Sequence, residues 1–80
     1  MYEEEYQHLI DKARDAKLGG HDSWRPMSAG EKVAIALLLN RPEWLTEMDY
    51  TIPQAIERAG PVWMRLIPII AQTLADEDES

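Results

Sequence analysis

Acidic side chains and a histidine recur with helical spacing near the start of the chain. Glu4, His8, Asp11 and Asp15 follow one another at intervals of four, three and four residues, which places them on one face of a helix. Carboxylate and imidazole groups are of the type that binds divalent cations. However, a single helix rarely encloses an ion, because such sites draw ligands from several helices. We therefore interpret the row as a solvated helix surface and expect no metal or cofactor.

The run His21-Asp22-Ser23 contains the three residue types of a hydrolase triad. A triad brings these side chains together from separate segments in a defined geometry, whereas consecutive side chains diverge. Stabilisation of a local turn by Asp22 or Ser23 is the ordinary explanation. The chain also lacks a glycine-rich phosphate loop and the HExxH and GxSxG motifs. The sequence therefore predicts a protein that is not an enzyme.

The charge of the chain is concentrated in two short segments. The 80 residues include 15 acids and 8 bases, and the formal net charge is −7. Residues 3–5 and 76–79 hold seven of the acids, while residues 6–75 are neutral on balance. Such acidity argues against direct nucleic-acid binding, and the lack of cysteine excludes disulfides and thiolate zinc sites. With no signal peptide or long apolar run, we expect a cytoplasmic location and no membrane contact.

Apolar periodicity and capping signals predict helices along the whole chain, with no competing strand pattern. The expected helices cover residues 3–17, the segment from the Ser28 capping box to Leu39, residues 41–48, residues 52–59, and a last helix after Gly60-Pro61. Pro68 lies inside that last helix and predicts a kink or break there. The prediction is a compact all-α bundle of four to five helices with short connections. Residues 1–75 form its single domain, and residues 76–80 form an acidic disordered tail.

Two short segments share a helix-start signature with proline in the first turn. Asn40-Arg41-Pro42-Glu43 and Thr51-Ile52-Pro53-Gln54 each place a capping residue first and Glu or Gln three residues later. For the second of these helices, the expected core-facing residues are Ile52, Ala55, Ile56 and Ala59.

Tryptophan, arginine and methionine supply the candidate contacts to a partner. Trp and Arg are enriched at binding hot spots, and Met provides an adaptable apolar surface. Trp24 is the strongest candidate, because it lies in the irregular connection over residues 20–27. The candidate partner-binding residues are Trp24, Arg25, Met27, Trp63, Met64, Asp76, Glu77, Asp78 and Glu79.

Small size, acidity, lack of cysteine and lack of catalytic motifs resemble, in general character, the small acidic anti-defence proteins of phages and plasmids, such as anti-CRISPR proteins. No family motif is matched, so no residue role is carried over. The resemblance implies a protein that binds and inhibits a basic host complex that itself binds nucleic acid. The neutral middle of the chain argues against full mimicry of nucleic acid.

Two alternatives remain open on the sequence. A helical adaptor or homodimer would use the apolar surplus of residues 62–70. A DNA-binding regulator would use residues 51–70 as a helix-turn-helix, but only Arg65 of its second helix is suited to contact DNA.

Overall fold

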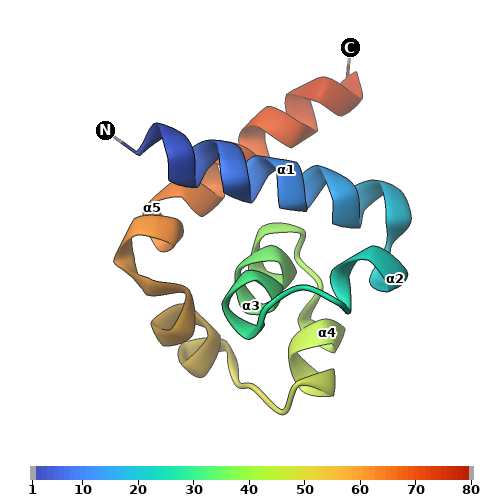
Figure 1. The fold of residues 1–80 in the computed structure, drawn as a ribbon, viewed down its shortest axis with the longest axis vertical. Coiled ribbons are helices and arrows are strands. Elements are labelled where there is room, and N and C mark those ends of the chain that lie inside the picture. The colour runs from blue at the N-terminus through green and yellow to red at the C-terminus, as the bar shows by residue number, and fades with distance from the viewer. Residues whose placement is uncertain (1, 80) are drawn as a thin grey trace.

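The computed structural model describes residues 2–79, which form five helices and no strand. The helices are α1 (Glu3–Gly19), α2 (His21–Trp24), α3 (Ala29–Leu38), α4 (Pro42–Glu47) and α5 (Ile52–Glu79). Helix α3 lies in the middle and contacts α1, α4 and α5 (Figure 1). The predicted all-α bundle with short connections is therefore confirmed. None of the described helices is both long and apolar enough to cross a bilayer.

Helix α3 begins at the predicted capping box. The Glu31 N–H donates to Ser28 Oγ at 3.3 Å, and the Ser28 N–H donates to Glu31 Oε1 at 3.0 Å. From this start the helix is apolar on nearly all sides, and residues 33–36 are fully buried. A helix of this composition must be covered by the rest of the chain.

Helices α3 and α4 are each followed, two residues after their last residue, by a residue with left-handed backbone. Asn40 has φ of 56° and Asp49 has φ of 61°. The Arg41 N–H donates to the Ala36 carbonyl and the Tyr50 N–H donates to Leu45, which is the long hydrogen bond of a Schellman motif. Asn and Asp tolerate this conformation better than other non-glycine residues. The chain therefore changes direction within a few residues after each of these two helices.

Asn40 was expected to cap α4, and this prediction is wrong. The N-cap of α4 is Arg41, which makes no side-chain cap bond, because Asn40 is occupied in ending α3. The matching prediction at Thr51 is correct. The Thr51 N–H donates to Gln54 Oε1 at 2.8 Å, and the Gln54 N–H donates to Thr51 Oγ1 at 3.2 Å.

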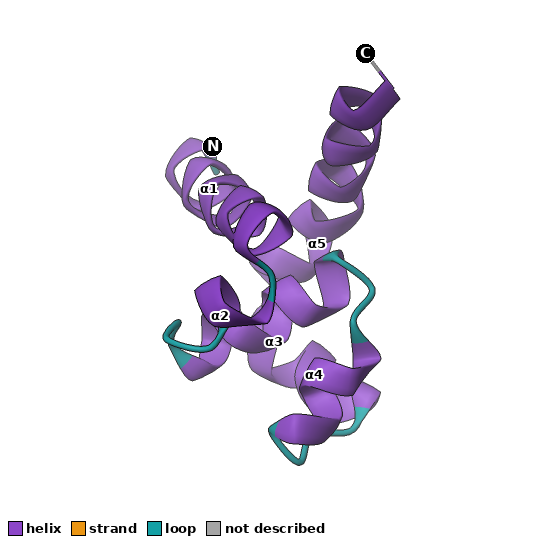
Figure 2. Ribbon diagram, turned by 90° about the vertical axis from the view of Figure 1, so that its right-hand side faces the viewer, coloured by secondary structure: helices purple, strands orange, loops and turns teal. Residues whose placement is uncertain are grey.

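Helix α5 is interrupted at Gly60 rather than at Pro68. Gly60 has φ of 85° and ψ of 166°, whereas the residues around Pro68 keep helical dihedral angles. Glycine adopts positive φ without penalty, and Pro61 then starts the second part of α5. The helix boundary predicted at Gly60-Pro61 is therefore confirmed, whereas the chain is not broken at Pro68. Figure 2 shows the second part of α5 rising away from α3 and α4.

The first part of α5 packs through its alanines. Ala55 is fully buried and Ala59 half-buried, while Ile52 and Ile56 are 54% and 42% exposed. The expectation that both isoleucines face the core is wrong. The alanines rather than the isoleucines pack against the core, so the isoleucines lie on the flank of the helix.

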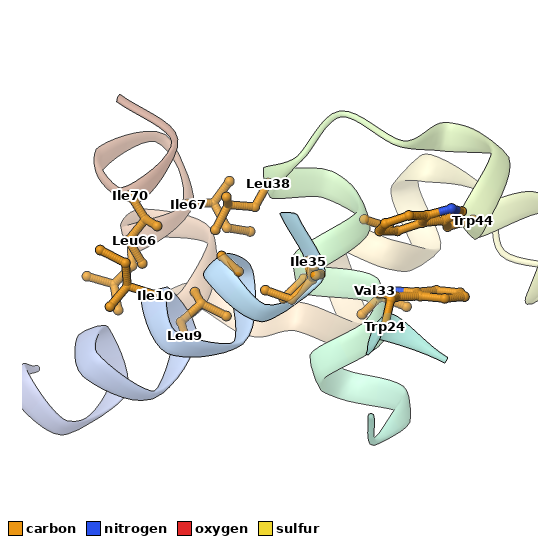
Figure 3. Packing of buried hydrophobic residues seen from close by; sticks show 14 of the residues in the cluster. Leu9, Ile10, Trp24, Val33, Ile35, Leu38, Trp44, Leu66, Ile67 and Ile70 are labelled. Carbon is orange, nitrogen blue, oxygen red and sulfur yellow. The ribbon is translucent and has the colours of Figure 1, made fainter. Parts of the chain in front are cut away.

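Trp24 lies in the core and contradicts the expectation of a partner contact. Its ring stacks on Trp44 with centroids 4.9 Å apart and planes at 28° (Figure 3). The indole Nε1–H donates to the Lys32 carbonyl at 2.8 Å, and the Lys32 ammonium lies 5.2 Å from the ring centroid. The connection that the sequence suggested is irregular contains the single turn α2, which directs the indole inward. The Trp24 side chain is fully buried and therefore cannot contact a partner.

We expect Trp24→Ala to lower the free energy of unfolding by about 3–5 kcal/mol, because it leaves a cavity beside Trp44 and removes the hydrogen bond to the Lys32 carbonyl. Urea titration followed by far-ultraviolet circular dichroism measures this loss. Leu18→Ala is the control, since Leu18 is 90% exposed, and its effect should stay within about 0.5 kcal/mol. If Trp24→Ala does not fold, Trp24→Phe gives the same comparison with a smaller loss. Equal effects of the Trp24 and Leu18 variants would contradict a core role.

Candidate partner-binding surface

Folding brings the two acidic segments to one side of the molecule. In Figures 1 and 2 alike, α1 and the last turns of α5 lie at the upper end, with α4 at the lower end. We call α1 together with residues 76–79 the acidic layer. Its nine acids and three bases account for six of the seven net negative charges. The remainder of the chain is almost neutral.

Two ion pairs hold the end of α5 against α1. Arg14 Nη2 donates to Glu77 Oε2 at 2.5 Å, and Lys17 Nζ donates to Asp78 Oδ2 at 2.5 Å and to the Leu74 carbonyl at 3.3 Å. The hydrogen bond from Arg14 lowers the pKa of Glu77 below its ordinary value.

These contacts correct the expectation of a disordered tail, because residues 76–79 continue α5 as helix. Acids at a helix C-terminus oppose its dipole, and the two bases on α1 offset that effect. The bases are far away in the sequence and adjacent only in the fold. Ser80, the last residue of the expected tail, and Met1, the first of the expected domain, lie outside the described residues, as does the side chain of Glu79.

The first turn of α1 carries three consecutive exposed carboxylates of the acidic layer. Glu3, Glu4 and Glu5 are all exposed, and the positive end of the helix dipole favours carboxylates at this position. Asp76 at the other end of the layer is also exposed and accepts a hydrogen bond from Gln72 at 2.9 Å.

The other candidate contact residues are divided between two regions. Half-buried Trp63 stacks on His8 of α1, with centroids 6.2 Å apart and planes at 27°. Met64 beside it is also half-buried and packs against the core. Arg25 is exposed and Met27 half-buried in the connection that follows α2. The fold thus places Trp63 beside α1 but leaves Arg25 and Met27 on another element.

The members of the acidic row on α1 contact different partners. His8 Nε2 lies 2.5 Å from Glu31 Oε2 of α3, and Asp11 accepts from Gln7 at 2.9 Å. Within residues 2–79, no group of three or more acidic or histidine side chains is arranged to hold a metal ion. His21 is likewise engaged with a neighbouring helix, since its Nε2 lies 2.8 Å from Glu47 of α4.

The second part of α5 contributes most of its apolar residues to the core. Leu66, Ile67 and Ile70 are buried, whereas Ile69 is 52% exposed. Most of the apolar side chains of residues 62–70, which suggested a self-association face, are therefore buried or partly buried in the molecule. Arg65 is exposed, so a DNA-reading helix here would present one basic side chain.

Two surface hollows were not anticipated from the sequence. One lies between α1 and α5, has a volume of about 470 Å³ and is lined by Tyr2, Glu3, Tyr6, Gln7 and Leu66. The other, of about 480 Å³, is lined by Asp49, Tyr50, Gln54, Glu57 and Arg58. Tyr2 and Tyr6 stand out in the sequence as one apolar helix face. Nothing in the sequence places Leu66 opposite them.

No protein-family model matches the sequence, and no curated protein or solved structure has significant similarity to it. The function is therefore inferred from the geometry and charge of this chain.

Glu31 joins α1 to the start of α3. One carboxylate oxygen accepts from the Ser28 N–H and the other contacts His8. Partial burial tends to raise the pKa of Glu31, but the hydrogen bonds from Ser28 and His8 outweigh it and lower the pKa below its ordinary value. A carboxylate of this kind stabilises the fold above its unfolded pKa, about 4.3 for glutamate. That contribution is lost as the pH falls through the folded pKa.

We expect Glu31→Gln to reduce the loss of unfolding free energy between about pH 7 and about pH 3. Glutamine keeps the capping oxygen but cannot be titrated, so this part of the acid sensitivity disappears. Urea titrations across that pH range measure the change. Glu4→Gln is the control, because it makes the same chemical change at an exposed position of α1. An unaltered pH profile in Glu31→Gln would contradict the assignment.

Proposed function

We propose that the protein is a non-catalytic binding protein that attaches to a basic surface of a larger macromolecular partner through the acidic layer. The observation that supports this proposal best is that the acidic layer, with one acidic segment at the start of α1 and the other beside its end, lies on one side of the fold and holds six of the seven net charges. Concentrating like charges is unfavourable for the isolated fold. Binding to a partner of opposite charge would relieve this repulsion, and this would increase both the affinity and the association rate.

The resemblance to small anti-defence proteins gives the proposal a specific partner class. Such a partner would be a host complex with a basic channel for nucleic acid, and occupation of the channel would inhibit it. The charge pattern fits contact with part of such a surface, because Arg14 and Lys17 interrupt the acids. The partner contacts then combine long-range attraction by the acids with local recognition beside α1.

The proposal is tested with two variants that each remove three negative charges. Glu3, Glu4 and Glu5 are replaced by Gln in the acidic layer, and Glu43, Glu47 and Glu57 are replaced by Gln outside it. Partners are recovered by affinity capture from cell lysate, and association is then measured by surface plasmon resonance. We expect the layer variant to associate at least about tenfold more slowly, with a weaker salt dependence. The matched variant should retain most of the wild-type rate.

Two results would contradict the proposal. One is the absence of any reproducible partner. The other is equal slowing by the two triple variants, which would show that net charge matters and its position does not.

A homodimer is the second candidate, and it is favoured by two exposed isoleucines in the first part of α5. Ile52 and Ile56 are one helical turn apart and together form an apolar strip. Burying such a strip against its copy would be favourable.

Light scattering after size-exclusion chromatography at increasing concentrations tests the dimer. We expect twice the chain mass for the wild type and the single mass for the double variant Ile52→Asn/Ile56→Asn. Ile69→Asn is the control, because Ile69 is equally exposed but lies in the second part of α5. A wild-type protein of single mass at every concentration would exclude this candidate.

A further inference from the structure

We propose that the hollow between α1 and the second part of α5 receives an arginine side chain of the partner. We call this hollow the tyrosine groove, defined by Tyr2, Tyr6, Leu66, Glu3 and Gln7. The inference rests on the proposed function, since it identifies the point where a basic partner is recognised.

The walls of the tyrosine groove are aromatic and aliphatic. Tyr2 and Tyr6 are four residues apart and therefore lie on the same face at the start of α1. Both are half-buried, so each ring keeps part of its surface open. Leu66 of α5 is only 6% exposed and forms an apolar boundary. The groove has a volume of about 470 Å³ and is widely open to solvent, so a side chain can enter it from outside.

The polar groups at the groove select a cation. Glu3 lines it directly, and Glu4 and Glu5 follow in the same helical turn. Gln7 gives its amide N–H to Asp11 at 2.9 Å, so its amide oxygen remains as an acceptor. The groove therefore combines a carboxylate and an acceptor oxygen with aromatic rings, while a neighbouring anion would be repelled.

Arginine fits this combination better than the other cationic side chain. Its planar guanidinium stacks on aromatic rings and forms two parallel hydrogen bonds to one carboxylate. Lysine is a more strongly hydrated point charge. The positive end of the α1 dipole opposes any cation at this position, and the glutamates of the first turn offset it.

The experiment uses the intact protein and a short capped peptide, glycine on both sides of one arginine. A second peptide carries citrulline, which has the same shape as arginine but no charge. Titrations are followed by the amide and aromatic resonances of the protein in nuclear magnetic resonance spectra. We expect shifts concentrated at Tyr2, Glu3, Tyr6 and Leu66, and clearly weaker binding of the citrulline peptide.

Variants of Tyr2 and Tyr6 distinguish the contribution of the aromatic rings to arginine binding from the contribution of the charge. Tyr2→Leu and Tyr6→Leu should each weaken arginine binding about two- to fivefold, the range of one exposed cation–π contact. Tyr2→Phe and Tyr6→Phe retain the rings and should bind like the wild type. If Tyr6→Leu disturbs the fold, Tyr2→Leu provides the test, because Tyr2 lies at the start of the first helix. Equal binding of the Leu and Phe variants would overturn the inference.

The outcomes distinguish this inference from the proposed function. Arginine shifts that map to residues 76–78 instead of the groove overturn the groove but leave the acidic layer as a binding surface. Equal binding of the citrulline peptide also overturns it, because the groove would then not select a cation. Arginine bound in the groove, without any partner that depends on Glu3, Glu4 and Glu5, would support the groove and contradict the proposed function.

Discussion

The burial of α3 is the constraint on which the rest of the structure depends. Its ten residues are apolar on nearly every side, so no single neighbour can cover it. Helices α1, α4 and α5 surround it instead (Figure 1). The ends of α3 are fixed by local hydrogen bonds, with the Ser28–Glu31 box at its start and left-handed Asn40 at its end. Because both ends are defined locally, the chain enters and leaves the core at fixed places.

The packing of the other helices around α3 explains why both acidic segments lie on one side of the molecule. Helix α1 and the second part of α5 both cross the same side of α3, so both acidic segments lie on that side, one at the start of α1 and the other beside its end. Arg14 and Lys17 then offset the repulsion at the end of α5 by pairing with Glu77 and Asp78. Exposed ion pairs contribute little to stability, so their main effect is positional. They place the last turn of α5 beside α1.

The sequence was sufficient where the signal is local. The helix at residues 52–59, its capping residue Thr51 and the box at Ser28 depend on neighbours within one turn, and all are correct. It was insufficient where a distant residue decides the outcome. Trp24 is buried because Trp44 and Lys32 receive it, and the tail is helical because α1 supplies bases. The tyrosine groove depends in the same way on Leu66, which is remote from Tyr2 in the sequence.

The acidic layer and the isoleucine strip occupy different parts of the molecule. Ile52 and Ile56 lie on the first part of α5, which is at the lower end of both views, away from α1. A dimer formed through the strip would therefore leave both acidic layers uncovered. Two layers on one particle raise the effective concentration of the second after the first has bound. The homodimer and the partner-binding function are thus compatible, and a dimer would be the stronger ligand for a partner with repeated basic sites.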